Sequence, residues 1–331
     1  MRDFTLLTIG IPTFNRAPYI KELINSILIQ VDSTISHKLE VLISDNASTD
    51  NTEEVLREYQ EKYPQIFSYF KNEENVGFDK NVDLIFKRAK GKYVWLLSDD
   101  DTLENNSLSY LIDKINCCRQ CSVILVNYCE CSIEMNKYLK RIRQDIKEDV
   151  YCKDGNVFFQ ESKFLFGLVS SLIIKTQEWH SANITKYLGS NWIHVGAIIE
   201  ILQQKPACII AKHIVNLRTG NSEWGKQGSF LSYGFSLLDI FLNMKDLGYK
   251  KETYNQLIFN MYKGNFKAII SANSQGLRNK KDIAKRMIKY YYPYPSLWFI
   301  HLPILFVPNF LWFILKNTKA AVYKILKLTR P

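Results

Sequence analysis

Three adjacent carboxylates, Asp99, Asp100 and Asp101, follow the apolar run YVWLL at residues 93–97. Acids packed side by side repel one another, so they add little stability unless a cation neutralises them. Carboxylate oxygens suit Mg²⁺ or Mn²⁺, and these cations commonly bind phosphates as well. Capping of a short helix would explain one of the acids but not three. The cluster therefore predicts a divalent-cation site beside a phosphate-containing ligand.

Three more polar segments follow apolar runs earlier in the chain. They are Pro12, Thr13, Phe14, Asn15 and Arg16, then residues 45–50 beginning with Asp45, and finally Asn75, Gly77 and Asp79. The chain contains neither G-x-G-x-x-G nor G-x-x-x-x-G-K-[ST], the glycine-rich loops that cradle phosphates. A nucleotide bound here would therefore depend on the cation to neutralise its diphosphate.

Alternating strands and helices must position these segments. Apolar runs predict strands over 6–11, 39–44, 67–71, 93–98 and 122–128, and helical spacing predicts helices over 18–30, from Asp50 or Thr52 to about 62, over 79–90, and from Asn105 or Asn106 onward. This rhythm predicts an α/β fold with a mostly parallel sheet and helices on both faces. Because ligands bind beyond the carboxyl ends of such strands, we expect the four polar segments to converge on one edge.

The N-terminal apolar run is interrupted by Pro12, and no small-residue cleavage site follows it. It therefore favours a first strand over a signal peptide. Seven cysteines, five of them between Cys117 and Cys131, predict buried or idle thiols in a reducing compartment. A zinc site at these cysteines is the sharper alternative, but no repeated C-x-x-C pair supports it.

Charge is distributed unevenly along the 331 residues, although the net charge is +10. Residues 1–130 hold 14 Lys or Arg and 20 Asp or Glu, whereas residues 245–331 hold 16 Lys or Arg and only 3 Asp or Glu. An acidic N-terminal half argues against a nucleic-acid-binding protein, because such proteins place basic residues along the nucleic acid.

The basic C-terminal part surrounds residues 290–315, where no Asp, Glu, Lys or Arg occurs. Pro303 and Pro308 interrupt this stretch, tyrosines and tryptophans are spread along it, and both flanks are basic. These features favour a segment that lies in the interface of an anionic membrane, with a basic amphipathic helix over 316–327. A membrane-spanning helix or hairpin and a buried core helix are the alternatives.

Four ordered motifs resemble family-2 glycosyltransferases of the A-type fold, and in particular the bacterial O-antigen branch that includes abequosyltransferase-like enzymes. The motifs are Ile11–Arg16, Asp45–Asp50, Asn75-x-Gly77-x-Asp79-x-Asn81 and Leu96–Asp101, within about residues 4–130. Two short stretches farther on resemble the same branch more weakly. They are Gly167–Ser171 and Arg218-x-Gly220-Asn221-x-x-Trp224.

The resemblance implies roles for these residues. Residues 12–16 would wrap the base and ribose of a nucleotide-sugar donor, and Asp45 would accept a hydrogen bond from the base. Asn75, Gly77 and Asp79 would line the nucleotide pocket, with Asn81 bracing that loop. Asp99 and Asp101 would form the D-x-D pair, with Asp100 between them as a further cofactor-binding residue; Asp101 would bind Mn²⁺ or Mg²⁺, and Asp99 would contact ribose or sugar. The metal would stabilise the leaving nucleoside diphosphate.

The chain departs from the family where an acidic pair usually supplies the inverting base. At that distance it has Trp192-Ile193-His194-Val195, with Glu200 six residues beyond His194. His194 is then a general base, a third metal ligand, or a core or surface histidine. Glu200 either serves in catalysis or lies exposed.

The expected function is a metal-dependent, inverting transfer of a sugar to a glycan or lipid-linked saccharide in bacterial lipopolysaccharide or other surface polysaccharide synthesis. The expected location is the cytoplasmic face of the bacterial inner membrane, as a peripheral or monotopic protein. The expected domains are a catalytic domain over 1–240, with a nucleotide-binding half (1–130) and an acceptor half (131–240), and a helical C-terminal region over 241–331. The alternatives are a membrane-associated nucleotide-binding protein without transferase activity and a sugar-phosphate nucleotidyltransferase.

Overall fold

The computed structural model describes residues 5–220, 229–274, 277, 279–308 and 311. They form two compact units. Unit 1 takes in the described residues up to 220 together with 244–253, and unit 2 takes in 229–243 and the described residues from 254 on. The segment 244–253, which ends in the first residues of a helix, belongs to unit 1, and the helix before it belongs to unit 2; the predicted domain boundary at residue 240 stays a prediction.

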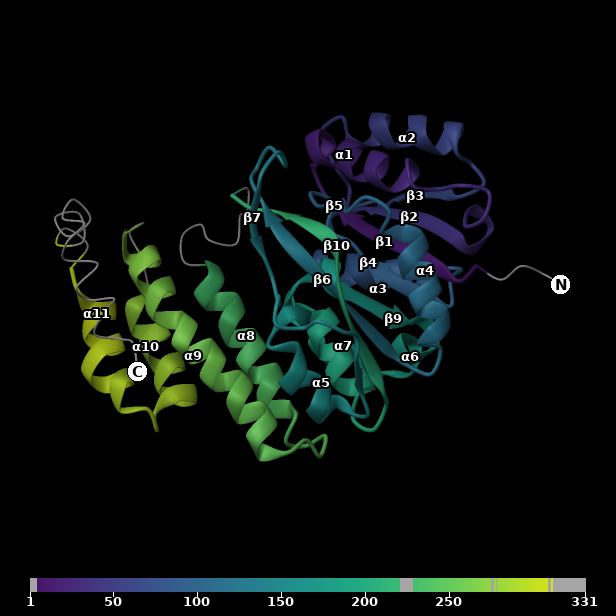
Figure 1. The fold of residues 1–331 in the computed structure, drawn as a ribbon. Helices are drawn as coiled ribbons and strands as arrows, with labels where there is room; N and C mark the ends of the chain where they lie inside the picture. The colour runs from purple at the N-terminus through teal and green to yellow at the C-terminus, as the bar shows by residue number, and fades with distance from the viewer. Residues whose placement is uncertain (1–4, 221–228, 275–276, 278, 309–310, 312–331) are drawn as a thin grey trace. The chain divides into compact units, whose positions relative to one another are not determined.

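Unit 1 is built on one sheet, shown in Figure 1. Its strands are β1 (Leu7–Thr13), β2 (Leu39–Asp45), β3 (Phe67–Lys71), β4 (Tyr93–Leu96), β5 (Thr102–Leu103), β6 (Val123–Cys131), β7 (Tyr138–Arg141), β8 (Val150–Cys152), β9 (Leu172–Lys175) and β10 (Ala207–Arg218). The strand order is β3-β2-β1-β4-β9-β6-β10-β5, with β7 paired to β6 and β8 paired to β10.

The first four strands of this order are parallel, and their register places Thr13 opposite Asp45. Strand β9 is antiparallel to both β4 and β6, so β6 runs in the same direction as β4, and β10 is parallel to β6. The prediction of a mostly parallel sheet is confirmed, and so are its five predicted strands. Strands β5, β7, β8, β9 and β10 were not predicted.

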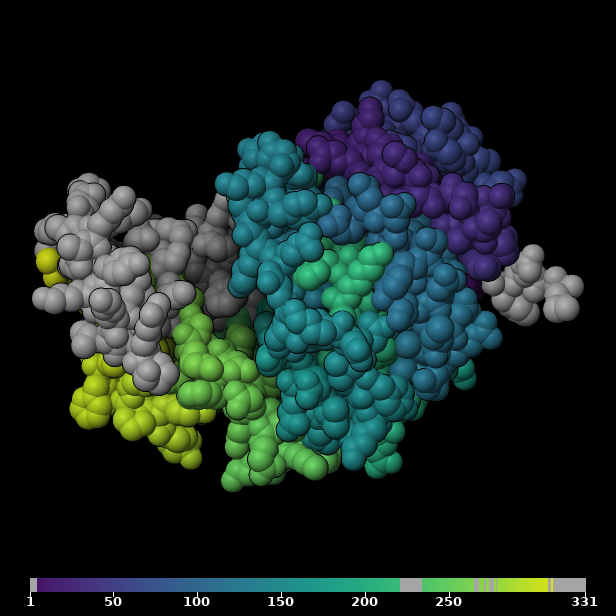
Figure 2. Space-filling model, in the orientation of Figure 1, coloured from purple at the N-terminus to yellow at the C-terminus, as the bar shows by residue number. Residues whose placement is uncertain are grey.

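Helices cover both faces of the sheet in unit 1. They are α1 (Ala17–Leu28), α2 (Thr52–Lys62), α3 (Phe78–Arg88), α4 (Leu108–Cys117), α5 (Gly155–Ser162), α6 (Thr176–Ser181) and α7 (Ile193–Ile201). Apolar residues of α1, α2 and α4 pack in one core with Ile9 and Trp95 of the sheet. In the space-filling view, the purple and blue residues of the N-terminal half gather on one side of unit 1 (Figure 2).

Helix α3 packs on the opposite face, where it lies close to β1. A side chain at Gly10 would bring its Cβ to 2.3 Å from Cγ2 of Ile85, so only glycine allows this approach. Phe86 of α3 stacks on Trp179 of α6, with ring centroids 3.7 Å apart. This face therefore joins the N-terminal half of unit 1 to the segments that follow β9.

Unit 2 is helical. It contains α8 (Ser229–Asn243), most of α9 (Lys251–Ser274), α10 (Lys280–Tyr291), a π-helical turn (Leu297–His301) and α11 (Leu302–Phe306). Leu297, His301 and Leu305 are buried, whereas Tyr292, Trp298, Phe299 and Phe306 are exposed. Of the helices that the structure describes, none is both long enough and apolar enough to cross a membrane. The predicted helix over 316–327 lies outside the described residues.

Candidate active site

The loops after β1 and β2 are joined by hydrogen bonds at the carboxyl edge of the sheet. The backbone N–H of Asn15 donates to Oγ of Ser48 (2.9 Å), and Oδ1 of Asn15 accepts from the backbone N–H of Thr49 (2.8 Å). Asn15 holds a left-handed backbone, with φ of 54°, which asparagine tolerates better than most residues. Beside it, the Phe14 ring is exposed. Residues 12–16 and 45–50 therefore form one connected surface, as expected.

Asp45 is fully buried at the end of β2. Its Oδ1 accepts from the backbone N–H and the hydroxyl of Ser48 (2.9 and 2.6 Å), and its Oδ2 accepts from the Tyr69 hydroxyl (2.9 Å). Burial and this carboxylate raise the pKa of Tyr69. Asp45 shapes the loop in this structure, and its contact with a base remains a prediction.

A chain of asparagines attaches the third loop to the second. Asn46 donates through Nδ2 to Oδ1 of Asn75 (2.7 Å) and accepts from the backbone N–H of Val76 (2.9 Å). Asn81 donates to the carbonyl oxygen of Ser44 (2.9 Å) and accepts from Asn72 (3.0 Å). The loop therefore carries Asn75 and Gly77 to the same edge of the sheet.

Asp79 was expected to line the nucleotide pocket, but its contacts lie elsewhere. The side chain is buried, and its two oxygens accept from the backbone N–H groups of Asn191 (2.8 Å) and Ile193 (3.2 Å). Burial raises the pKa of Asp79, and the backbone donors oppose that shift. Asp79 thus caps the start of α7 and holds the segment before it.

The acid loop, residues 98–101, follows β4 at the same edge. Oδ1 of Asp99 lies 3.7 Å from Nε of Arg16, which connects this loop to the loop after β1. Asp101 has no exposed surface, and its oxygens accept from the Ser170 hydroxyl (2.6 Å) and the Arg218 backbone N–H (3.0 Å). The four polar segments therefore converge as the sequence predicts.

Both buried acids have raised pKa values. Burial, followed by the neighbouring Asp100 carboxylate, raises the pKa of Asp99 to about 7 and that of Asp101 to about 8. The Arg16 guanidinium opposes the shift at Asp99, and the Ser170 hydroxyl opposes it at Asp101. Two carboxylates that are costly to ionise beside a third are well suited to neutralisation by a cation.

Ser170 and Arg218 are parts of the site for which the sequence predicted no role. Both occur in the two stretches that weakly resemble the O-antigen branch. This weak resemblance was the one feature of the sequence that pointed to them. Ser170 lies in a turn before β9, and Arg218 ends β10. Neither β9 nor β10 was predicted, so their contacts with the acid loop could not be anticipated.

His194 lies at the start of α7 with only 1% of its surface exposed. Its Nε2 is 3.4 Å from the carbonyl oxygen of Gly167, and the rings of Phe78 and Trp192 lie beside it. Burial lowers the pKa of His194 to about 4, so the imidazole is neutral near pH 7. Of the three predicted roles, this setting is that of a core histidine.

Glu200 lies farther along α7, partly buried. Its Oε1 accepts from the Tyr187 hydroxyl (2.8 Å) and pairs with Nζ of Lys186 (2.6 Å). Glu200 is therefore neither free nor simply exposed, and its carboxylate stabilises the packing of α7 against the turn at Thr185–Tyr187.

No group of three or more His, Cys, Asp or Glu residues in the described part of the chain is arranged to hold a metal by itself. The role of His194 as a third metal ligand beside Asp99 and Asp101 stays a prediction. Cys121, Cys129, Cys131, Cys152 and Cys208 are buried free thiols, and zinc ligation by the cysteines finds no support in their arrangement.

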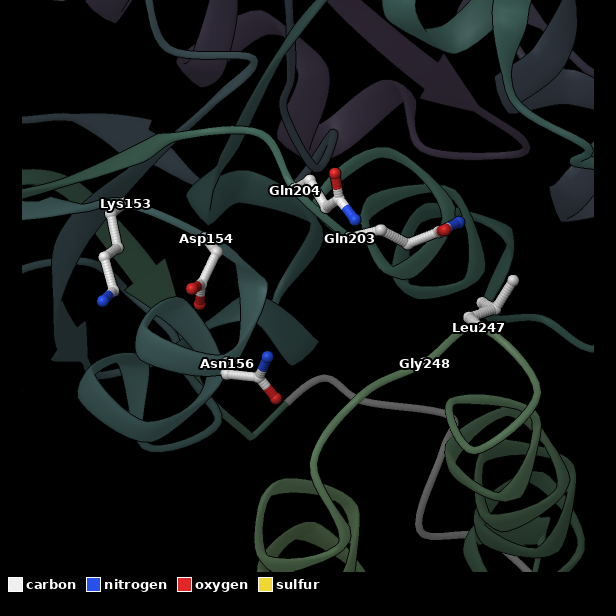
Figure 3. Close-up of a pocket in the computed structure, with 7 residues that line it drawn as sticks. All are labelled: Lys153, Asp154, Asn156, Gln203, Gln204, Leu247 and Gly248. Atoms are coloured by element: carbon white, nitrogen blue, oxygen red, sulfur yellow. The ribbon is translucent and has the colours of Figure 1, made fainter.

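A polar cavity of about 430 Å³ occurs elsewhere in unit 1 (Figure 3). It is lined by Lys153, Asp154, Asn156, Gln203, Gln204, Leu247 and Gly248. It lies near the start of β10, whereas Arg218 at the other end of that strand contacts the acid loop. This cavity is distinct from the candidate active site.

Comparisons with known proteins agree with this geometry. Residues 8–172 match the model of a family described as "Glycosyl transferase family 2". Abequosyltransferase RfbV of Salmonella typhimurium is 29% identical over 238 residues, 67% of this chain and 69% of that protein. The GalNAc(5)-diNAcBac-PP-undecaprenol beta-1,3-glucosyltransferase of Campylobacter jejuni is 32% identical over 110 residues, 33% of this chain and 34% of that protein.

Solved structures show the same fold. S. aureus TarS 1–349 in complex with UDP-GlcNAc has a TM-score of 0.65, with 91% of this chain and 83% of that chain covered. The mannosyltransferase PcManGT of Pyrobaculum calidifontis, in complex with GDP-Man and Mn²⁺, has a TM-score of 0.52, with 97% and 86% covered. Both are 17% identical to this chain, so the likeness concerns the fold alone.

Proposed function

This chain belongs to glycosyl transferase family 2 and is a glycosyltransferase, and on that premise we propose that it moves a sugar from a nucleotide-sugar donor to a lipid-linked saccharide. The convergence of four polar loops on the buried acids Asp99 and Asp101 carries this proposal. The product would belong to a bacterial surface polysaccharide.

The donor would bind across the joined loops. Phe14 presents an exposed ring that can stack on a base, and Arg16 carries a cation next to Asp99 that can meet the diphosphate. Asn75 and Gly77 lie at the rim of the same edge. These groups supply the stacking, the positive charge and the backbone freedom that a nucleotide requires.

The acid loop fits a divalent cation because its three aspartates offer carboxylate oxygens, and because burial and crowding make the charges of Asp99 and Asp101 costly without one. Asp99 and Asp101 would hold it, since each Asp101 oxygen accepts one hydrogen bond and retains a second lone pair. When bound, Mn²⁺ or Mg²⁺ neutralises charge on the departing nucleoside diphosphate.

The transfer would proceed by a single displacement with inversion, in which a base deprotonates the acceptor hydroxyl. His194 and Glu200 were the predicted bases, but burial closes off His194, and Glu200 is paired with Lys186 and Tyr187. We therefore assign the base to neither of them. The residues of this chain that we assign to the reaction bind and orient the donor.

The acceptor proposal rests on the relatives and on the surface of unit 2. The name of the Campylobacter jejuni relative includes PP-undecaprenol, a lipid carrier. In unit 2, Trp298 and Phe299 are exposed on the π-helical turn, and Lys281, Lys285 and Arg286 are exposed on α10, which contacts that turn. Exposed aromatic and basic side chains favour the interface of an anionic membrane, which we propose to be the cytoplasmic face of the inner membrane.

A nucleotide-release assay tests the function. Full-length protein is incubated with UDP-, dTDP-, CDP- and GDP-sugars, with lipid-linked saccharide acceptors, and with Mn²⁺ or EDTA. We expect release of one nucleoside diphosphate that stops with EDTA and falls at least 100-fold in Asp101→Asn. An Asp113→Asn variant is the matched control, because Asp113 is exposed on α4. Absence of metal-dependent turnover or binding with every donor would overturn the proposal.

A further inference from the structure

The acid loop is held in place by side chains from two distant segments of the chain. Ser170 lies in the turn Val169–Ser171 before β9, and Arg218 is the last residue of β10. Ser170 is 69 residues from Asp101 along the chain, and Arg218 is 117 residues from it. The contacts of Ser170 and Arg218 with the acid loop lie outside the motif Leu96–Asp101, so that motif does not account for them.

Ser170 closes the loop with one hydroxyl. Its Oγ donates to Oδ2 of Asp101 (2.6 Å) and accepts from the backbone N–H of Ser98 (2.9 Å). These are the last and first residues of the acid loop. The Ser170 carbonyl accepts from Nε1 of Trp95 in β4 (2.9 Å), so Ser170 is itself fixed to the strand from which the loop emerges.

Arg218 supports the other side of the loop. Its backbone N–H donates to Oδ1 of Asp101 (3.0 Å), and its Nε donates to the carbonyl oxygen of Asp100 (2.8 Å). The guanidinium also bonds to Ile133 and Glu22. Arg218 thereby anchors the loop to α1 and to the turn that follows β6.

We propose that Ser170 and Arg218 are positioning residues, which keep Asp99 and Asp101 directed at the diphosphate and its cation. The proposal rests on the proposed function. Three adjacent carboxylates repel one another, so an unsupported loop would open before the ligand binds. The hydrogen bonds from Ser170 and Arg218 hold the loop closed, so that it need not rearrange when the ligand binds. Groups that orient metal-binding residues in this way strongly affect metal affinity.

Ser171 provides a matched control for Ser170. Both serines are fully buried in the same turn. The Ser171 hydroxyl donates to the carbonyl oxygens of Leu165 (2.8 Å) and Leu168 (2.7 Å), and no hydrogen bond connects it to the acid loop. Ser170→Ala and Ser171→Ala therefore each remove one buried hydroxyl, but only the first releases the loop.

The first measurement is hydrogen exchange of the full-length variants without any ligand. We expect the Ser98 amide to exchange at least tenfold faster in Ser170→Ala than in the wild type, with no change in Ser171→Ala. Arg218→Lys removes the Nε contact with Asp100 while keeping the charge, and we expect faster exchange across residues 98–103.

The second measurement is calorimetric binding of Mn²⁺ in the presence of UDP, dTDP, CDP or GDP. We expect Ser170→Ala to bind Mn²⁺ 10- to 100-fold more weakly than the wild type, and Ser171→Ala to stay within threefold. Unchanged Ser98 exchange in Ser170→Ala would overturn the proposal, as would equal losses in both serine variants. If the wild type bound neither nucleotide nor Mn²⁺, the proposed function would fail, while the exchange rates would still decide whether Ser170 holds the loop.

Discussion

Asp99 and Asp101 are acids placed where water cannot solvate their charges. Their raised pKa values mean that the folded protein binds protons more tightly there than the unfolded chain does. Folding stability therefore falls as the pH rises from the unfolded pKa of about 4 towards the folded values. If a cation binds there as proposed, it would remove that cost, and ligand binding and stability would be coupled at these two residues.

Replacing Asp101 by asparagine tests this coupling. In EDTA, we expect Asp101→Asn to melt at a higher temperature than the wild type by a few degrees, with a difference that grows between pH 4 and pH 8. Asparagine carries no charge, so the cost of burying it does not change with pH, whereas the cost of burying Asp101 rises as the pH rises. Calorimetry across this pH range measures the effect. A difference that is the same at every pH would show that Asp101 ionises in the folded protein at no cost.

His194 is expected to be dispensable for the reaction, because its surroundings are those of the core. We expect His194→Phe to retain transfer activity within threefold of the wild type, since a ring of similar size can pack between Phe78 and Trp192. Initial rates at saturating donor and acceptor measure this. A loss of 100-fold or more, in a variant that melts like the wild type, would restore His194 as a catalytic residue.

At the scale of elements, the alternation of strands and helices was readable from the sequence as far as β6, apart from the two-residue strand β5 (Thr102–Leu103). Buried parallel strands are continuous apolar runs, and the helices between them carry apolar residues at helical spacing. The later strands of the sheet could not be predicted. Strand β9 is antiparallel and lies between β4 and β6, which are far from it in the sequence, and the pairing of β10 with β6 is interrupted by bulges. The contacts of Ser170 and Arg218 with the acid loop could not be predicted for the same reason, because these residues adjoin β9 and β10.

Asp79 shows that residues adjacent in the sequence can have distant partners in the fold. It lies next to Asn75 and Gly77 in the sequence, which suggested a shared role in the nucleotide pocket. On α3, however, its side chain meets the backbone N–H groups that precede α7, more than 100 residues away. No local pattern predicts such a partner, whereas Asn81 was predicted to brace the loop and does bond to Ser44 and Asn72.

Removal of the Asp79 carboxylate should therefore loosen α7. We expect Asp79→Ala to lower the free energy of unfolding by about 1–3 kcal/mol, because buried N–H groups lose their acceptor. Urea denaturation measures this, with Asp113→Ala as the control at an exposed position. Nucleotide affinity should stay within threefold, and a selective loss of nucleotide binding without destabilisation would return Asp79 to the nucleotide pocket.

At the scale of the molecule, the two ends of the chain differ in charge, and we propose that this difference reflects different roles. The acidic surplus accompanies the half with the acid loop, and the basic surplus accompanies unit 2. We propose that a cation and a diphosphate bind in the first, and that the second meets an anionic lipid surface. The net charge of +10 alone describes neither the acidic N-terminal half nor the basic C-terminal part.

Phe299 and Ile29 allow a matched test of the membrane proposal, because each has 82% of its surface exposed, one in unit 2 and one in unit 1. We expect Phe299→Asp to reduce sedimentation with phosphatidylglycerol-containing vesicles at least fivefold, and Ile29→Asp to leave it unchanged. High salt should weaken wild-type binding. Equal sedimentation of both variants, or none of the wild type, would contradict membrane association through unit 2.

The segment 244–253 has a consequence for how the chain can be divided. Tyr249 donates to the carbonyl oxygen of Ile199 (2.7 Å), and Asn156 accepts from the backbone N–H of Lys250 (3.0 Å) and from the Thr253 hydroxyl (2.9 Å). A stop codon after residue 240 would remove these contacts and strip a piece from unit 1, leaving buried polar groups without partners. The catalytic part therefore has no single cut point, and a shortened enzyme must keep α8 in order to keep the turn behind it.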